Sequence, residues 1–332
     1  MIRFPESAIV AAVVVALLLG AARPAHADDD AHLLRLGEHF YAAGQYYRAV
    51  GTFEELALFT SDPRTRVHAQ LRVAQSYHHG AQIDEAVAAY DVVLGALGTG
   101  PDGADTRGYV HLLRVLVRAD GVWRGVVAIP LGDLAAEIEP LTHDDGRAFQ
   151  VLAGFHLARL RLADDDRAGA RAAYEAAKAR CQARPVDDCA AVARLAGPID
   201  APGPDHKSPA LGIFLSAVVP GLGSMYSGSY FDAAYYFGLT VGSGLLAADV
   251  YDRDARFGQQ AAAFYVLSAL AVTFYAANVT QGWLGTVRHN EVQKVEHRRR
   301  VLEETEIPLP LEGGLPGAEG APAAEPAVTS ND

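Results

Sequence analysis

The sequence of 332 residues contains few sulfur-bearing residues, with two cysteines and two methionines. Two cysteines exclude a disulfide-dense fold, in which many bridges substitute for a hydrophobic core. The chain also lacks an excess of positive charge, because 28 lysines and arginines stand against 40 aspartates and glutamates and give a formal net charge of −12. Phosphate binding needs a basic face, so this balance argues against nucleic acid as a partner.

The residue patterns of common catalytic sites are missing as well. Gly221-x-Gly223 has no third glycine and follows no strand, so it does not indicate a dinucleotide loop, and no Gly-x-Ser-x-Gly elbow occurs. His78 and His79 are adjacent and would point about 100° apart on a helix. That geometry favours solvent-facing groove or turn residues over ligands of one metal. We predict no enzyme, no metal and no cofactor, although a site completed by a partner stays open.

Residues 1–27 have the pattern of a signal peptide. Arg3 gives a positive start, Ile9 to Leu19 form a short apolar core, and Ala25-His26-Ala27 matches the small-x-small cleavage pattern. Because the positive region is thin, an uncleaved membrane anchor is the alternative. In both cases the following domain is exported.

An internal repeat begins in that domain, which we assign to residues 28–196. One pattern of small and aromatic residues occurs twice: Leu36-Gly37-x-x-Phe40 with Ala49-x-x-x-Phe53, then Val73-Ala74-x-x-Tyr77 with Ala86-x-x-x-Tyr90. The small residues would admit the ring from the neighbouring helix of the same hairpin, and Gly44 and Ala81 would mark the turns. The pattern resembles the tetratricopeptide repeat, whose helix hairpins stack into arrays with a concave binding groove.

Two further units are weaker copies of the repeat. The third, near Tyr109 to Leu134, has Pro130 where the second aromatic belongs, and the fourth, from Thr142 to Arg180, recovers Ala170-x-x-x-Tyr174. The resemblance implies about four helix pairs that bind peptides or helices; a stack with no ligand is the alternative. We expect polar residues of the first helices to line the groove: Glu38, His39, Gln75 and His78.

Cys181 and Cys189 lie eight residues apart and would meet an oxidising compartment after export. On one continuous helix they would be about 12 Å apart, beyond disulfide reach. Pro185 lies between them and can break the helix. We predict a structural disulfide rather than a zinc site, because the spacing fits no common zinc pattern and no histidine is close.

Residues 197–207 are rich in proline and glycine and are predicted to be a linker without helix. A transmembrane domain, residues 208–287, follows. Ser208-Pro209 can start a helix, and Pro220-Gly221-Leu222-Gly223 would bend or break it. The two apolar runs that come next, Tyr230 to Val250 and Ala261 to Leu284, are each near or above the roughly 20 residues needed to cross a membrane. We expect two crossings by these runs, and the first stretch could be a third, short one.

The motif around the break carries a second resemblance. The residues Pro220, Gly221, Gly223, Tyr226 and Gly228 resemble a family of small bacterial membrane domains with a Pro-Gly-x-Gly-Gln-x-Tyr-x-Gly signature. Four residues further on belong to the same resemblance: Tyr275, Asn278, Gly282 and Asn290. The resemblance extends more distantly to the two-transmembrane-helix domain and covers residues 208 to 292. It implies an integral membrane module and no catalytic residue. Where the signature commonly has glutamine, this chain has Ser224.

Charge near the apolar runs bears on topology and function. Arginines and lysines gather in residues 288–304, predicted to be a basic juxtamembrane helix, whereas residues 305–332 are predicted to be a disordered tail. A cytoplasmic basic helix after an exported array needs three crossings, which we slightly favour. Asp249, Asn278 and Gln281 lie within or near the apolar zone, and we expect interhelical hydrogen bonds rather than an ion path.

The chain is therefore predicted to be all-α, a tetratricopeptide-like array followed by a two- or three-helix transmembrane hairpin domain. We predict a scaffold for protein–protein interactions at the bacterial inner membrane, with the repeats in the periplasm. Envelope proteins or peptides would bind the groove, the bilayer would surround the apolar helices, and a homo-oligomer is possible. The alternative function is a small oligomeric transporter, channel or insertion factor, with the repeats as its assembly handle.

Overall fold

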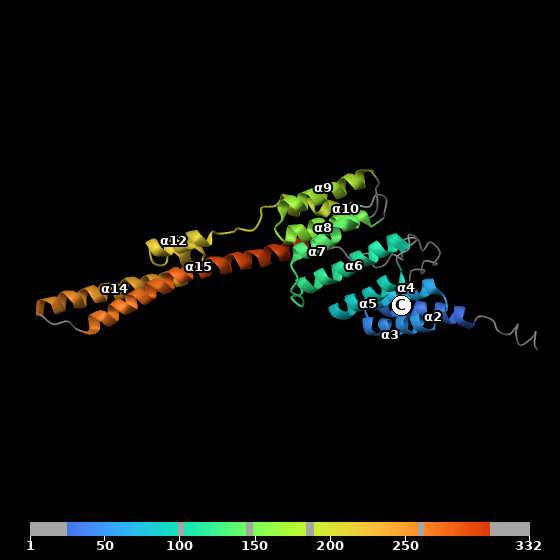
Figure 1. The fold of residues 1–332 in the computed structure, drawn as a ribbon, viewed down its shortest axis with the longest axis horizontal. Coiled ribbons are helices and arrows are strands. Elements are labelled where there is room, and N and C mark those ends of the chain that lie inside the picture. The colour runs from blue at the N-terminus through green and yellow to red at the C-terminus, as the bar shows by residue number, and fades with distance from the viewer. Residues whose placement is uncertain (1–24, 99–102, 144–148, 184–188, 258–261, 306–332) are drawn as a thin grey trace, which may run out of the picture. The chain divides into compact units, whose positions relative to one another are not determined.

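A computed structural model describes residues 25–98, 103–143, 149–183, 189–257 and 262–305 (Figure 1). All the regular secondary structure within these ranges is helical. Most of the predicted signal peptide and the tail beyond residue 305 lie outside the described residues. The described chain forms two compact units, one of residues 25–160 and 173–192 and one of residues 161–172 and 193–305. Helices α8 and α9 each contribute to both units.

Four helix hairpins account for most of the first unit, and the turn of the fourth hairpin belongs to the second unit. Their bounds are α2 (Ala25–Ala42) with α3 (Tyr46–Phe59), α4 (Pro63–His79) with α5 (Ile83–Ala96), α6 (Ala104–Trp123) with α7 (Leu131–Ile138), and α8 (Gln150–Ala163) with α9 (Arg167–Ala183). A short 3-10 helix, η2 (Glu139–Thr142), follows α7, and α10 (Cys189–Arg194) follows α9. The described part of the chain is thus all-α, as predicted.

The first helix of each hairpin ends in the same way. One residue at each end has a positive φ: Gly44 (69°), Ala81 (60°), Gly125 (71°) and Asp165 (65°). The next amide bonds to the carbonyl five positions earlier: Gln45 N to Phe40 O at 2.8 Å, Gln82 N to Tyr77 O at 3.0 Å, Val126 N to Gly121 O at 2.9 Å and Asp166 N to Arg161 O at 2.9 Å. This bond is typical of the Schellman motif. The predicted turns at Gly44 and Ala81 are confirmed.

Small residues admit aromatic rings within the hairpins. A Cβ atom added at Gly37 of α2 would lie 2.5 Å from the Phe53 ring of α3, so only glycine fits there. In the third hairpin Pro130 precedes α7 as its N-cap, and the Phe149 ring packs against Gly108 of α6. The other residues of the predicted packing pattern are buried or half-buried: Phe40, Ala49, Ala74, Tyr77, Ala86, Tyr90, Ala170 and Tyr174.

The predicted linker differs from the structure at its start. Residues Ala196–Asp200 form a short helix, α11, in which Pro198 is the third residue. Proline is compatible with the first turn of a helix, because amides there have no partner within the helix. The extended part of the linker is therefore shorter than the sequence predicts.

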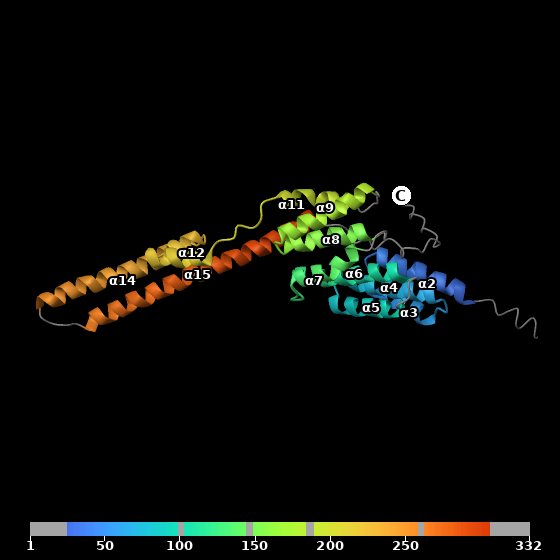
Figure 2. The ribbon, with the colours of Figure 1, turned by 45° about the horizontal axis from the view of Figure 1, so that its top comes forward.

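The second unit contains the apolar helices α12 (Pro209–Val218), α13 (Leu222–Tyr226), α14 (Tyr230–Phe257) and α15 (Ala262–Glu304). Helices α14 and α15 lie side by side, and α12 lies along α15 (Figures 1 and 2). The helix α15 is continuous for 43 residues. It joins the second apolar run and the basic segment, which the sequence analysis places in separate parts.

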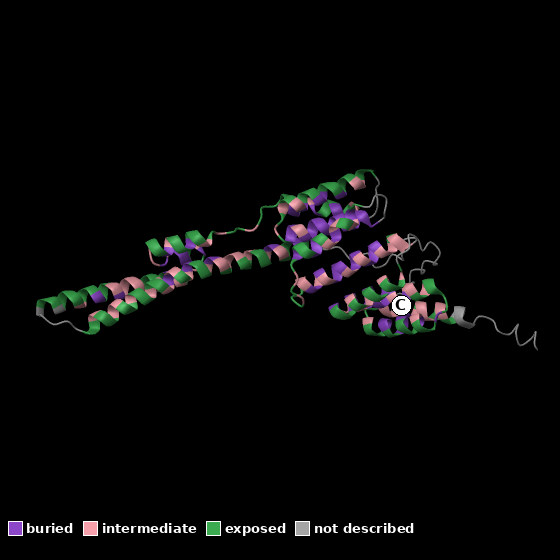
Figure 3. Ribbon diagram, in the orientation of Figure 1, coloured by how far each residue is buried: buried purple, intermediate pink, exposed green. Residues whose placement is uncertain are grey.

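Burial differs between the helices, as Figure 3 shows: α8 is mostly buried, whereas α14 and α15 are mostly exposed or intermediate. Within the described chain, α15 is the one helix that is long and apolar enough to cross a membrane. Helix α12 is apolar but has only 10 residues. The length and composition of α15 indicate membrane association.

Candidate functional site

The candidate site is the break between α12 and α13. Ser208 caps α12, its Oγ accepting from Leu211 N at 3.4 Å, and Pro209 occupies the first turn. After Val218 the chain becomes extended at Val219, passes Pro220 and reaches Gly221 with a φ of 89°. A side chain at Gly221 would also meet the Ala233 carbonyl of α14. Both the conformation and the contact therefore require glycine here.

Two side chains of α15 complete the backbone hydrogen bonding at the break. Asn278 is fully buried; its Oδ1 accepts from Gly221 N at 2.7 Å and its Nδ2 donates to Ser216 O at 2.8 Å. The hydroxyl of Tyr275 donates to Ala217 O at 2.8 Å. The last carbonyls of a helix have no partner within it, so these bonds replace the ones that Pro220 ends.

Three glycines bring α12, α13 and α15 into contact. A Cβ atom at Gly212 would lie 2.5 Å from the Gly282 carbonyl oxygen, and one at Gly282 would lie 2.6 Å from the Gly212 oxygen. A Cβ atom at Gly223 of α13 would lie 3.0 Å from Gly282 Cα. Distances this short leave no room for a side chain, so the backbones themselves touch. The close approach places Asn278 within reach of the break.

A second set of bonds lies at the other end of α12. The amide of Asn290 spans Lys207, accepting from its backbone N and donating to its backbone O, both at 2.8 Å. The Tyr226 hydroxyl, at the end of α13, accepts from Ser208 N at 3.0 Å, and the Lys207 ammonium lies 5.6 Å from the Tyr226 ring centre. After Lys207, helix α12 therefore runs along α15 to the break, and α13 brings the chain back so that Tyr226 lies beside Ser208.

The polar side chains that the sequence places in the apolar zone have protein partners. Gln281 Nε2 donates to Asp232 Oδ2 of α14 at 3.2 Å, and Asn278 bonds between α15 and α12. These two form the interhelical bonds that we expected. Asp249 differs, because it pairs with Arg253 one turn further along α14.

The side chains exposed around the site are apolar. The sequence contains no charged residue from Pro209 to Tyr230. Phe214 and Val218 of α12 are each 61% exposed, and Leu246 of α14 is 57% exposed. Further exposed apolar residues lie on the helices α12 to α15: Leu211, Ile213, Met225, Tyr230, Phe231, Tyr235, Phe237, Leu245, Tyr251, Tyr265, Val266, Leu270, Val272, Tyr275, Trp283 and Leu284.

The four residues predicted to line a groove in the array do not form one surface. His39 is exposed, but Gln75 and His78 are 1% and 3% exposed, so the prediction that they face an open groove is wrong. Glu38 forms an ion pair with Arg72, whose Nη1 donates to Gln75 Oε1 at 2.8 Å. These polar groups bind one another between α2 and α4.

His78 is buried because α6 approaches it, with Asp120 Oδ2 lying 4.0 Å from its Nε2. Burial lowers the pKa of His78 to about 4, although Asp120 acts in the opposite direction. His156 of α8 is 2% exposed, and burial lowers its pKa well below the usual value. Both imidazoles are therefore neutral at pH 7.

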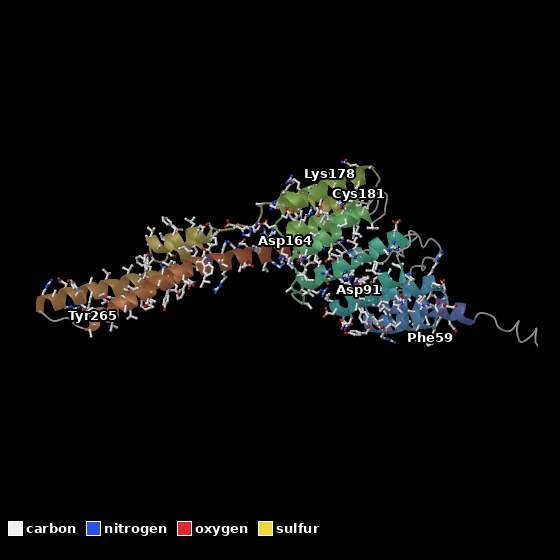
Figure 4. All side chains as sticks on the ribbon, in the orientation of Figure 1. Phe59, Asp91, Asp164, Lys178, Cys181 and Tyr265 are labelled. Carbon is white, nitrogen blue, oxygen red and sulfur yellow. A yellow bond between two sulfur atoms is a disulfide. The ribbon has the colours of Figure 1, made fainter. Side chains whose placement is uncertain are left out.

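Cys181 and Cys189 form a disulfide, with their Cα atoms 5.6 Å apart. Cys181 lies near the end of α9 (Figure 4), and Cys189 begins α10. The predicted turn around Pro185 lies outside the described residues. The bond closes the end of the fourth hairpin onto α10.

Four site residues of α15, Tyr275, Asn278, Gly282 and Asn290, belong to the motif quoted from the sequence, but their partners and Thr286 were not predicted. One pattern could have indicated the shared face. Polar and small residues recur every four positions on α15, which places them on one helical face. The members are Asn278, Gly282, Thr286 and Asn290. Asn278 bonds to Ser216 of α12 and to Gly221 at the break, Gly282 and Thr286 contact Gly212 of α12, and Asn290 bonds to Lys207, two residues before α12.

In comparisons with known proteins, no protein-family model, no curated protein and no solved structure matches the chain. The site geometry and the hairpin array therefore carry the functional argument.

Proposed function

We propose that this chain is a membrane-anchored scaffold of the bacterial cell envelope. In this proposal a tetratricopeptide-like array on the periplasmic side binds other envelope proteins, and the helices α12 to α15 hold it at the inner membrane. The observation that carries the proposal is the recurrence of one helix ending in all four hairpins, followed by helices whose exposed side chains are apolar.

The proposed topology has two crossings, α14 and α15. Ten residues of helix span about 15 Å, half of the roughly 30 Å hydrocarbon core, so α12 is too short to cross. The favoured three crossings are therefore replaced by two. The apolar stretch of α14 is less apolar than that of α15, but the helix has 28 residues, which is long enough to cross. We assign it the first crossing, with α15 returning, because α14 lies against α15 and contacts the break through Ala233.

Two crossings place the end of α15 on the same side as the array. A contact within the second unit supports this, since His297 Nε2 of α15 lies 2.8 Å from the Leu162 carbonyl oxygen at the turn between α8 and α9. The disulfide favours the oxidising periplasm for that side. The basic residues of α15 favour the cytoplasm. We assign the periplasm, because an exported array would carry α12 and the end of α15 with it.

The polar contacts favour an anchor over the alternative of a transporter or channel. An ion path needs polar groups that are available to the ion. Asn278 uses both ends of its amide on backbone groups, and Gln281 bonds to Asp232. These residues stabilise the helix packing.

Topology is tested by adding single cysteines to the full-length chain in intact cells. A membrane-impermeant thiol reagent should label Val295→Cys, on the exposed end of α15, and should not label Ala255→Cys, near the end of α14. Labelling of Ala255→Cys alone would put the array in the cytoplasm. Labelling of both sites would mean that the chain does not cross the membrane.

The scaffold role is tested by a photo-crosslinking residue at His39, the exposed member of the predicted groove set. Capture of one recurrent envelope protein, lost when Gly37→Leu disturbs the first hairpin, would support the scaffold. Gly51→Ala is the matched control, since a Cβ atom there meets nothing within 4 Å. Capture of nothing, or of the chain alone, would favour the transporter alternative.

A further inference from the structure

We infer that α12 and α13 insert into one leaflet only, the leaflet on the side of the array, and that this wedge makes the protein prefer a membrane curved with that leaflet outermost. The inference rests on the proposed membrane anchor and its two crossings. Its partner is the acyl-chain region of a curved bilayer.

The depth of the break places it within one leaflet. Asn278, which binds Gly221, lies six residues before Leu284, the last residue of the apolar run. Six residues correspond to about 9 Å along a helix, less than half of the roughly 30 Å core. From Ala233, which is level with the break, α14 continues a further 24 residues to Phe257. The opposite leaflet therefore contains α14 and α15 without α12 and α13.

The hydrogen bonds at the break satisfy the backbone groups that would lack partners in the core of a bilayer. Irregular backbone within a bilayer must find partners in the protein, because lipid offers none. Asn278 and Tyr275 supply those partners to Gly221, Ser216 and Ala217. At the opposite end of α12, the charged residue Lys207 marks the level of the headgroups.

The exposed surface of α12 is apolar, and this identifies lipid acyl chains as its partner. Gly212 and Ser216 face α15 and are buried, whereas Leu211, Phe214 and Val218 are exposed. These exposed side chains continue the apolar surface of α14 and α15, which lipid covers in the proposed topology. Extra helical volume in one leaflet widens the module on that side, and such asymmetry couples binding to curvature.

Leaflet placement is tested in full-length protein reconstituted into vesicles with the array outward. A fluorophore on Phe214→Cys should be quenched by a bromine-labelled lipid exchanged into the outer leaflet. The matched control is a fluorophore on Leu246→Cys, which is 57% exposed and lies thirteen residues beyond Ala233. That site is about 20 Å deeper than the break and should not be quenched. Equal quenching at both sites would overturn the one-leaflet placement.

Curvature preference is tested by pulling a narrow tube from a giant vesicle that holds the same oriented protein. We expect the protein-to-lipid ratio in the tube to exceed that of the flat membrane by about twofold. Leu211→Ala with Phe214→Ala narrows the wedge and should abolish the enrichment. Leu246→Ala with Leu270→Ala narrows the opposite leaflet and should preserve or increase it.

Two outcomes separate this inference from the function on which it rests. Release of the protein by alkaline extraction would reject the membrane anchor itself. Stable insertion with a tube-to-flat ratio of one would reject the wedge and leave the anchored scaffold intact.

Discussion

In the array, backbone bonds close the end of the first helix of every hairpin, whereas the end of α12 also needs side chains from α15. The array ending needs one residue with a positive φ, and glycine, alanine and aspartate all serve. The α12 ending needs Asn278, which both accepts and donates. Where water can reach a helix end, the bonding tolerates many sequences. Where the surroundings are apolar, it depends on one residue far along the chain.

Asn278→Leu should have the largest effect. It removes the partners of Gly221 N and Ser216 O, and each buried group without a partner costs about 1–3 kcal/mol. We expect the module to lose about 2–5 kcal/mol of unfolding free energy. Fluorescence of Trp283 in detergent, in a Trp123→Phe background, would measure this loss.

The control for Asn278 is Thr280→Val. Thr280 is exposed, and its hydroxyl donates only within its own helix, to Ala276 O at 3.0 Å. Its substitution should change the stability of the module little. If Asn278→Leu and Thr280→Val had equal effects, side-chain closure of the break would be rejected.

Gly37→Leu should disturb the array to a similar degree. The added side chain meets the Phe53 ring, which is fully buried and cannot leave without opening the hairpin. Overpacking of this kind costs about 1–3 kcal/mol. Denaturant unfolding of full-length protein, followed by Trp123 fluorescence in a Trp283→Phe background, would report the change. Gly51→Ala should leave the midpoint unchanged or raise it, and a fall of equal size there would contradict the packing argument.

Acid should destabilise the array, because burial lowers the pKa of two of its histidines, His78 and His156. His78 has a native pKa of about 4 and an ordinary unfolded value near 6.5, so only the unfolded chain takes up a proton between these values. Stability is therefore complete above pH 6.5 and falls as the pH drops toward 4, by about 3 kcal/mol for His78. His156 contributes in the same direction.

The pH dependence is measured with Trp123 fluorescence during denaturant unfolding at pH 7.5, 6 and 5. His78→Gln should flatten the dependence, because the glutamine does not titrate. His32→Gln is the control, since His32 is exposed. An unchanged slope in His78→Gln would show that burial of His78 does not set the acid sensitivity.

Local pattern predicted the array better than it predicted the break. The spacing of small and aromatic residues locates the turns at Gly44 and Ala81, because both depend on contacts within one hairpin. Burial of His78 comes from Asp120 on α6, more than forty residues away, so no local pattern indicates it. The helix α11 was not predicted, because proline usually indicates the end of a helix. Pro198 is compatible with α11 because it lies in the first turn of the helix.

The motif at the break was visible in the sequence, but its closure was not. Pro220 and Gly221 predict a change of direction wherever they occur. Which residues complete the bonding depends on how α12 lies along α15, and that follows from the glycines at positions 212, 223 and 282. Asn278 belongs to the motif, but the motif does not indicate its partner. The proposed number of crossings rests on the length of α12, which ends at Val218.

The smallest expected effect tests whether backbone conformation alone closes the array hairpins. Ala81 has a φ of 60°, a conformation that costs an ordinary residue about 1–2 kcal/mol and costs glycine almost nothing. Glycine also loses more conformational entropy on folding, by about 0.5–1 kcal/mol, so Ala81→Gly should stabilise the array by roughly 0.5–1 kcal/mol. The equivalent Gly44→Ala should destabilise it by a similar amount, as measured by Trp123 fluorescence during denaturant unfolding. Gly44 has open space around an added Cβ atom, so any loss there would come from the backbone rather than from packing. Shifts of the same sign in both variants would mean that contacts, and not φ, decide which residue ends these helices.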